Sequence, residues 1–326
     1  MNSKGELLPL FEKYALHELD NSYYRLRILS SKDSIDYAKK VGLRLLEKKD
    51  SFPIAVVKND RLAALAIVVH KEEDSNIFKK RIGSIEFLTI DRTLPSLERK
   101  MLISQLLHEC HKNWQISFDM ITTLIDFDQY DLLEAFQEIG AKVYGGNYTW
   151  VCQLSKINEA NLSDKLLEKV FFYQPEEKEL LIEYVKQSYS TYRSHYHADS
   201  HFEENISSEV YSAYIKEHLA NNGQVLVIKK NEDIIAFSTI NPHQEINRHF
   251  NKNLVAEIAY SGVSPSARGS RAYELTLIKG LELFKKQDFS YVVFGCSADN
   301  YVVQSIWIKL GDFRPRRFCY RFHWWL

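Results

Sequence analysis

Hydrophobic and polar positions repeat in the same order along two halves of the chain. The segment IAVVKNDRLAALAIVV, residues 54–69, places two apolar runs on either side of an Asn-Asp pair, which predicts two strands joined by a tight turn. The segment VLVIKKNEDIIAFSTI, residues 225–240, predicts the same hairpin about 172 positions later. Such a fixed spacing indicates an internal duplication.

The elements that follow each hairpin also correspond. A third strand (IEFLTI; AEIAYSGV) leads into an amphipathic helix and then an apolar strand (ITTLIDF; YVVFGCS). A second helix ends near a capping glycine, Gly140 or Gly311, before an aromatic closing strand (YTWVCQL; FCYRFHWWL). We therefore expect a mixed α/β (α+β) fold present twice, as domains 1–160 and 161–326 with the junction near residues 155–170.

Composition and charge exclude several classes of function. With 326 residues, of which 45% are hydrophobic and 26% charged, the chain can form two ordinary folded domains. A net charge of −1 lacks the basic excess of nucleic-acid binders, so we expect no nucleic-acid partner. The absence of a leader and of a long apolar run predicts a cytoplasmic protein without membrane contact. The four cysteines lie far apart, which favours buried thiols over a metal site.

A predicted strand is joined to a predicted helix by the segment RGSRAY, residues 268–273. Backbone N–H groups and the helix dipole favour phosphate at such a junction, although the same residues can also form a plain solvated turn. The segment resembles the pyrophosphate loop of the GNAT superfamily, Arg/Gln-x-x-Gly-x-Gly/Ala. Here Arg271 and Tyr273 stand where the family has two small residues, and Arg268 and Arg271 can themselves bond phosphate.

A second segment, SADNYVVQSIWIKLGDF, carries the same resemblance. It is similar to the GNAT segment in which an Asn opens a helix that ends in Leu-Gly-Phe; Asn300 takes that position and also suits a helix N-cap. Trp307 stands where many relatives have the tyrosine that protonates the leaving thiolate. Water, Tyr301 or Ser305 then has this role, or no acid is needed. The resemblance implies acetyl-CoA or 3-hydroxybutyryl-CoA as co-substrate, no metal, and a set of CoA-binding residues: Val263, Arg268, Gly269, Ser270, Arg271, Ala272 and Asn300.

Two places in the second half can supply a general base for an amine. Glu257 lies in EIAYSGVS, which resembles the strand of the histone-acetyltransferase branch of GNATs whose glutamate is the base. A carboxylate in a partly apolar wall has its pKa raised toward the working range, whereas an ion pair across the sheet is the structural alternative. The other place is TYRSHYHADSHF, in which His197 and Asp199 are the catalytic candidates.

The histidine-rich segment also resembles part of the bacterial sugar-nucleotide N-acyltransferases of this superfamily. In these enzymes Ser-x-x-His-x-Asp and a following aromatic residue lie between the first helices, and here Ser194, His197, Asp199 and Phe202 take those places. A surface loop is the alternative, and a metal site is disfavoured because no second cluster supplies further ligands. Aromatic rings suit a nucleobase or a sugar. The substrate-binding residues that we expect are Tyr192, Ser194, His195, Tyr196 and Tyr260.

The first half lacks the phosphate loop. Its corresponding segment, TIDRTLPSLERKML, has no Gly-rich element, and Pro95 at the predicted helix start supplies no N–H. We expect a degenerate GNAT-like copy that binds no CoA and serves as a scaffold or as a wall of the acceptor pocket. Glu86, the repeat partner of Glu257, is then structural.

Together these features predict an acyl-CoA-dependent N-acyltransferase that acts by direct transfer, without a covalent intermediate. The resemblance implies the amine of a nucleotide-linked amino-deoxy sugar as acceptor, as in relatives that acylate dTDP-fucosamine or add hydroxybutyrate to a dTDP-3-amino-3,6-dideoxyhexose. The expected partners are these small molecules, and a homodimer is compatible with them. One alternative is an aminoacyl-tRNA-dependent ligase with a duplicated GNAT fold, which the near-neutral charge disfavours. Another is a non-enzymatic acyl-CoA-sensing module, which would not need Glu257.

Overall fold

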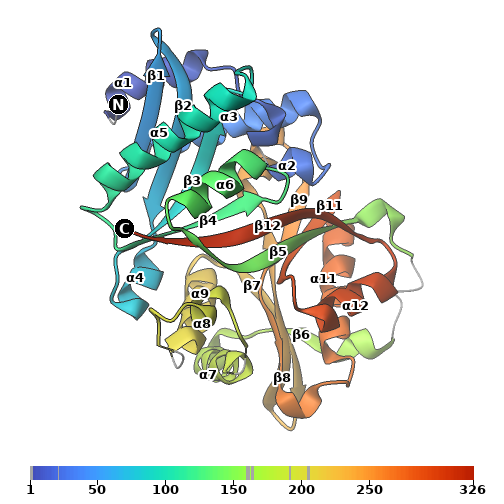
Figure 1. Ribbon diagram of the computed structural model, residues 1–326. Coiled ribbons are helices and arrows are strands. Elements are labelled where there is room, and N and C mark those ends of the chain that lie inside the picture. Colours follow the sequence, from blue (N-terminus) through green and yellow to red (C-terminus); the bar gives the residue numbers. More distant parts are fainter. Residues whose placement is uncertain (1–2, 21, 159–161, 163–164, 191, 204–205) are drawn as a thin grey trace. The chain divides into compact units, whose positions relative to one another are not determined.

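The structure is a computed structural model that describes residues 3–20, 22–158, 162, 165–190, 192–203 and 206–326. The chain divides into two compact units (Figure 1). Unit 1 comprises Met1–Gly146 and Arg317–Leu326, and unit 2 comprises Asn147–Arg316. Each unit combines helices with a sheet, so the predicted mixed α/β duplication is confirmed.

Unit 1 contains a sheet in the order β1-β2-β3-β4-β12, in which neighbouring strands are antiparallel except for β3 and β4. Its elements are α1 (Lys4–Lys13), η1 (Glu18–Asp20), α2 (Ser22–Arg25), α3 (Ser31–Glu47), β1 (Ser51–Lys58), β2 (Arg61–His70), α4 (Glu72–Phe78), β3 (Ile82–Ile90), α5 (Ser96–Trp114), β4 (Met120–Asp126), α6 (Tyr130–Glu138), the start of β5 (Lys142–Gln153) and, from Arg317 onward, β12 (Phe313–Trp325).

The central strand β2 is buried along nearly its whole length because helices cover both faces of the unit 1 sheet. Successive side chains of a strand point to opposite faces. Ala64, Ala66 and Val68 join the core formed with α5 and α6, whereas the alternate residues Leu65, Ile67 and Val69 join the core formed with α1 and α3. A continuous apolar run such as RLAALAIVVH is therefore what this position requires.

Unit 2 contains a sheet in the order β5-β11-β9-β8-β7-β6, with β10 paired to β8. Its further elements are η2 (Leu154–Lys156), η4 (Lys165–Lys169), β6 (Val170–Phe172), η5 (Pro175–Glu177), α7 (Lys178–Tyr189), α8 (His195–Ala198), α9 (Ser207–Ala220), β7 (Gln224–Lys230), β8 (Asp233–Pro242), α10 (Gln244–Phe250), β9 (Val255–Ile258), β10 (Ser261–Val263), η7 (Pro265–Ala267), α11 (Ala272–Lys286), β11 (Tyr291–Ser297) and α12 (Tyr301–Leu310).

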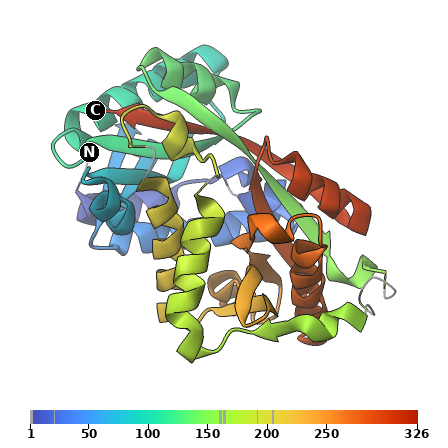
Figure 2. The same cartoon turned by 90° about the horizontal axis from the view of Figure 1, so that it is seen from below.

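Helices cover both faces of the unit 2 sheet as well (Figure 2). One core combines α11 and Trp307 of α12 with Ala236, Ile240 and Ile258 of the strands. The opposite core combines α7 and α9 with alternate residues of β7 and β8, among them Phe237. The two faces of the unit 2 sheet thus pack against different helices.

Each unit contains a parallel strand pair that is joined over a short stretch only. In unit 1, β3 and β4 pair over Ile82–Ser84 and Met120–Thr122, although both strands continue beyond these residues. In unit 2, β9 and β11 pair over Val255–Ile258 and Tyr291–Phe294. Ligands of open α/β sheets bind outside the carboxyl ends of such strands, where the next helix begins.

The predicted turns agree with the backbone. Asn59 and Asp60 have φ values of 49° and 59°, which the tight hairpin between β1 and β2 requires. Gly140 and Gly311, with φ values of 84° and 96°, end α6 and α12 as expected. The corresponding turn of the second half, at Asn231, also has a positive φ of 53°.

The closing strands join sheets in a way that the repeat did not predict. Residues 319–325 of β12, at the end of the second half, pair with β4 of unit 1, and residues 147–153 of β5, at the end of the first half, pair with β11 of unit 2. The units therefore differ from the expected ranges 1–160 and 161–326. Of the expected junction at 155–170, residues 159–161 and 163–164 lie outside the described part of the chain. In the described part, no helix is long and apolar enough to cross a membrane.

Candidate active site

The segment expected to bind phosphate forms a tight turn before α11. After β10 and η7, Gly269 and Arg271 both adopt positive φ values, 80° and 64°, and α11 begins at Ala272. The turn is held by Ser270, whose hydroxyl donates to the Ala267 carbonyl at 2.5 Å. The first intrahelical bond runs from the Leu275 N–H to the Arg271 carbonyl, and no side chain caps the helix start in the described part of the chain. The N–H groups of the first helical turn are thus available to an anion.

The two arginines of this turn differ in their surroundings. Arg271 donates from Nε and Nη2 to one oxygen of Glu274, at 3.0 and 2.5 Å. Arg268 is exposed, three residues earlier and just after η7. A phosphate bound to this turn would compete with Glu274 for Arg271, whereas Arg268 is accessible from solvent.

Asn300 and Trp307 have structural contacts in the helix that follows β11. The Asn300 side chain accepts a hydrogen bond from the Val303 N–H at 3.4 Å, as an N-cap does. Trp307 is 2% exposed, and its indole N–H donates to the Tyr273 hydroxyl at 2.8 Å, so it ties α12 to α11. Tyr301 lies on the surface at 72% exposure, with the Ser305 hydroxyl bonded to its carbonyl.

Glu257 carries a half-buried carboxyl group on β9. Its backbone lies between Asn241 of β8 and Val293 of β11. Ala256 and Ile258 belong to the core beneath α11, so by strand alternation the Glu257 side chain points to the other face. Among the described residues the carboxyl group has neither a hydrogen-bond donor nor a cationic partner, and burial raises its pKa. An acid of this kind can accept a proton from an ammonium group near neutral pH.

The strand is interrupted directly after β9, and hydroxyl groups hold the interruption in place. Tyr260 donates its N–H to the Thr239 hydroxyl at 3.0 Å, while its carbonyl accepts the Thr239 N–H at 2.8 Å. Next to it, the Ser238 hydroxyl is 2.9 Å from that of Ser261 and 2.7 Å from that of Thr276 on α11. The exit of β9 toward the turn at residues 268–271 is therefore fixed from both sides.

The histidine-rich segment forms a short capped helix. The Ser194 N–H donates to Nδ1 of His197 at 2.9 Å, and the Ser194 hydroxyl accepts the Tyr196 N–H at 3.2 Å. Asp199 is fully buried and accepts from the N–H and Nδ1 of His201, at 3.1 and 2.7 Å. His197 and Asp199 thus each have a structural partner within this segment, and because Nδ1 of His197 accepts a hydrogen bond, the neutral ring carries its proton on Nε2. The described residues contain no group of side chains suited to a metal ion.

Tyrosine side chains from α7, from the segment after it, from α9 and from the strand interruption gather on the face of the sheet that bears Glu257. The ring of Tyr189 stacks on Tyr211 at 4.0 Å between centroids, and Tyr192 contacts both rings edge-on at 5.5 Å. The Tyr189 hydroxyl donates to the Ser261 carbonyl at 3.0 Å. Tyr214 approaches Tyr260 at 5.6 Å. Burial raises the pKa of Tyr192 to about 12, so its hydroxyl stays protonated.

The structure brings some of the expected residues together and leaves others apart. Tyr192 and Tyr260 belong to the tyrosine cluster, whereas Tyr196 is buried against Phe202 and His195. Tyr211 and Tyr214 were missed by the sequence reasoning. Their spacing of three on α9 was the available signal.

Comparison with known proteins places the fold. No protein-family model and no curated protein matches the sequence. A GCN5-related N-acetyltransferase from Sphaerobacter thermophilus has a similar structure, with a TM-score of 0.60 and 10% identity over 88% of this chain and 85% of that one. A tandem GNAT protein from the clavulanic acid biosynthesis pathway gives a TM-score of 0.54 and 11% identity over 99% and 94%. A fungal GCN5-related glucosamine N-acetyltransferase region, within a multi-domain β-N-acetylglucosaminidase, gives 0.58 and 13% over 88% of this chain and 34% of that one.

Proposed function

The chain has the tandem fold of GCN5-related N-acetyltransferases, and we propose that unit 2 is an acyl-CoA-dependent N-acyltransferase. The observation that supports this most directly is the half-buried carboxyl group of Glu257, which has no partner among the described residues. It lies on the strand that leads to a helix start that no described side chain caps. The carboxyl group is suited to an amine, and the helix start is suited to a phosphate. Acetyl-CoA or 3-hydroxybutyryl-CoA is the proposed donor.

Donor binding is assigned to the turn between β10 and α11. The N–H groups of the first turn of α11 and the positive end of its dipole would receive the pyrophosphate, with Arg268 adding a charge-assisted bond. A Cβ atom at Gly269 would meet no atom within 4 Å, so the loop is open at this point. The positive φ of Gly269 and Arg271 turns the backbone into the helix.

Transfer is proposed to be direct. The amine nitrogen forms a bond to the thioester carbonyl carbon, and the carbon–sulfur bond then breaks to release the CoA thiolate. Glu257 takes the proton that the ammonium or the attacking amine loses. The thiolate, with a reference pKa of about 8.5 for thiols, is a tolerable leaving group and receives its proton from water. Trp307 has no part in this step, because it is buried against Tyr273.

The acceptor is proposed to be the amine of a nucleotide-linked amino-deoxy sugar, with a dTDP-linked sugar as the first choice. The half-exposed rings of Tyr192, Tyr214 and Tyr260 can stack on a sugar or a base, and their hydroxyls can bond to sugar oxygens. The fold is compatible with such an acceptor, since one similar structure is a glucosamine N-acetyltransferase region. His197, through Nε2, is proposed to contact the same substrate.

The test is incubation of the full chain with dTDP-amino sugars and each acyl-CoA, followed by mass spectrometry of the sugar nucleotide. We expect the mass to rise by one acyl group, with equimolar release of CoA thiol. A dTDP-sugar without an amine is the control and should stay unchanged. Binding of CoA without transfer to any amine would favour the sensing module instead, and transfer from charged tRNA would favour the ligase.

A further inference from the structure

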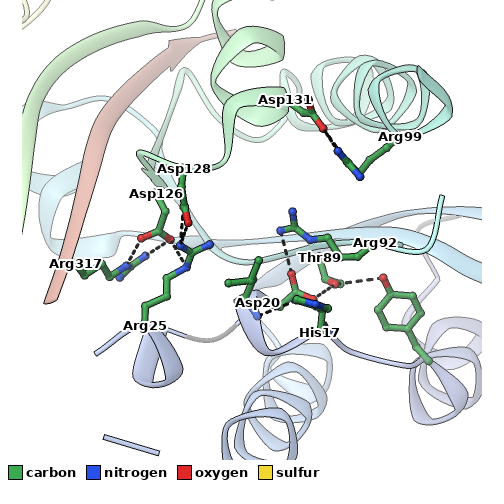
Figure 3. Close-up of polar contacts among 12 residues, drawn as sticks. His17, Asp20, Arg25, Thr89, Arg92, Arg99, Asp126, Asp128, Asp131 and Arg317 are labelled. Atoms are coloured by element: carbon green, nitrogen blue, oxygen red, sulfur yellow. Dashed lines mark hydrogen bonds and ion pairs between the residues drawn. The ribbon is translucent and has the colours of Figure 1, made fainter. Parts of the chain in front are cut away.

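Unit 1 contains a cavity of about 120 Å³ at the carboxyl ends of β3 and β4. It lies beyond the short stretch over which these parallel strands pair. Ile90 at the end of β3 and Ile103 of α5 form part of its apolar wall, and Arg92, Arg99, Asp128 and Asp131 bring charge to it (Figure 3). The cavity is therefore a charged pocket in the unit for which the sequence predicts no ligand.

Arg92 has more donors than the surrounding protein uses. Its only hydrogen bond with the described residues is to Asp20 at 3.5 Å, which is longer than the roughly 2.7–3.2 Å of a good N–H···O bond. Its Nε is buried and has no hydrogen-bond partner in the part of the chain that the structure describes. Asp20 itself is 1% exposed at its side chain and accepts better bonds from the Thr89 hydroxyl and the His17 N–H, at 2.9 and 3.1 Å. The guanidinium of Arg92 therefore lines the cavity with donors that the described residues leave unused.

Arg99 reaches the same cavity from the first turns of α5. Its Nε and Nη2 lie 2.7 and 2.6 Å from a single oxygen of Asp131, which leaves Nη1 without a partner among the described residues. Asp131 holds this guanidinium in place, because both contacts converge on one atom. Arg92, in the loop after β3, and Arg99, in α5, are thus two cations at one pocket, and each has N–H donors that the described residues do not use.

The carboxylates around the cavity are already paired. Asp128 accepts from Nη1 of Arg25 with both oxygens, at 2.6 and 2.7 Å, and Asp126 accepts from Arg317 at 2.6 and 3.1 Å (Figure 3). Arg25 is only 10% exposed at its side chain, and its Nη2 is a further buried donor that has no hydrogen bond to a described residue. The unmet hydrogen-bonding capacity of this cluster is therefore on the cationic side, which favours an acceptor-rich ligand.

We propose that this cavity binds a small oxyanion of the phosphate type between Arg92 and Arg99. The volume suits one such group and is well below the roughly 300–1,000 Å³ of pockets that enclose a whole drug-sized ligand, so it does not hold an entire CoA molecule. Arginine is the side chain best suited to bind phosphate through two parallel N–H bonds. The site is independent of the function proposed for unit 2.

The experiment is calorimetric titration of inorganic phosphate at constant ionic strength. The double variant Arg268→Ala/Arg271→Ala serves as background, because it removes the arginines of the phosphate turn in unit 2. We expect one saturable site in this background, and at least about tenfold weaker binding after adding Arg92→Gln or Arg99→Gln, the scale of one lost charge-assisted bond. Arg92→Lys, which keeps the charge, should retain part of the affinity.

Arg81→Gln is the matched control. Arg81 also belongs to unit 1 and pairs with an aspartate, Asp119, at 2.6 Å, but it lies outside the cavity lining. The Arg81→Gln substitution should leave phosphate binding unchanged. Circular dichroism checks that each variant is folded, and Arg99→Gln, which leaves the Asp20–Arg92 contact intact, remains informative if Arg92→Gln fails to fold.

Two arms distinguish the source of the oxyanion. If a nucleoside diphosphate binds more tightly than inorganic phosphate, and this gain also needs Arg92 and Arg99, the natural ligand is the phosphate end of a nucleotide. Equal affinity for inorganic phosphate and for the nucleoside diphosphate identifies free phosphate as the natural ligand. The absence of any saturable site in the background variant, or equal losses in Arg81→Gln and in the cavity variants, would overturn the proposal.

Discussion

Replacing Glu257 by Gln is expected to lower activity and to raise stability at the same time. If Glu257 accepts the amine proton, the maximal rate should fall by about 10²–10⁴-fold, the usual contribution of a general base. This corresponds to roughly 3–5 kcal/mol of transition-state stabilisation. CoA affinity should stay nearly constant, since the proposed CoA-binding residues begin only at Val263.

The gain in stability follows from the environment of the carboxyl group. Burial raises the pKa of Glu257 above its unfolded value, with no cation to compensate in the described part of the chain. As pH rises from the unfolded pKa to the folded pKa, the unfolded state loses its proton first, and stability is lost over that window. Gln avoids this loss of stability, because its side chain does not ionise. The urea midpoint of the variant should therefore exceed that of the wild type at pH 8, and the two should converge below about pH 4.

Initial rates from pH 6 to 9 at saturating acyl-CoA test the catalytic part. Glu86→Gln, at the repeat position in unit 1, is the control and should keep full activity because Glu86 is exposed. If His197 is the base, the rate loss and the disappearance of the acidic limb should follow His197→Asn. If water takes the proton, neither substitution should cost more than about tenfold. Full activity in Glu257→Gln would refute the assignment of the base.

Three further outcomes can be measured on single variants. Arg268→Ala should weaken CoA binding by about 1–3 kcal/mol in calorimetry that shows one site per chain; two equivalent sites would contradict the assignment to unit 2. Trp307→Phe should lower the free energy of unfolding in urea by about 1–3 kcal/mol, because the buried Tyr273 hydroxyl loses its donor, and adding Tyr273→Phe should recover part of the loss. Arg271→Gly should raise the melting temperature in calorimetry, because a left-handed conformation costs a side-chain residue about 1 kcal/mol and the ion pair to Glu274 is half exposed; a lower melting temperature would show that the pair outweighs the strain.

The local structure was predictable where the residue type by itself determines the backbone conformation. Asn59 and Asp60 tolerate positive φ, so the hairpin followed from the sequence, and Gly311 marked the end of α12 for the same reason. The strand-to-helix turn at residues 268–273 was predictable as a potential anion site, since its position after a strand is a local property. The tandem fold followed from the repeat.

Long-range partners were not predictable in the same way. An aromatic strand such as FCYRFHWWL has the same periodicity whichever sheet it joins, so the pairing of β12 with β4 needs the structure. The cap between Ser194 and His197 has a sequence signature of three positions, yet His is an unusual partner in it. The sequence did not predict Arg92 and Arg99 as ligand-binding residues, because the first half lacks the Gly-rich loop on which the prediction of a phosphate site depended.

The pairing of residues 317–326 with the first half of the chain has a consequence for synthesis on the ribosome. Unit 1 includes Arg317–Leu326, and Phe322 and Trp324 of this segment fill its core beside Phe136. Translation proceeds at about 5–20 residues per second, so the stretch between Gly146 and Arg317 takes on the order of ten seconds or more. Throughout that time β4 presents an unpaired edge and an unfilled apolar surface. We therefore expect the nascent first half to need protection by chaperones, and its final folding step to wait until residues 317–326 have been synthesised.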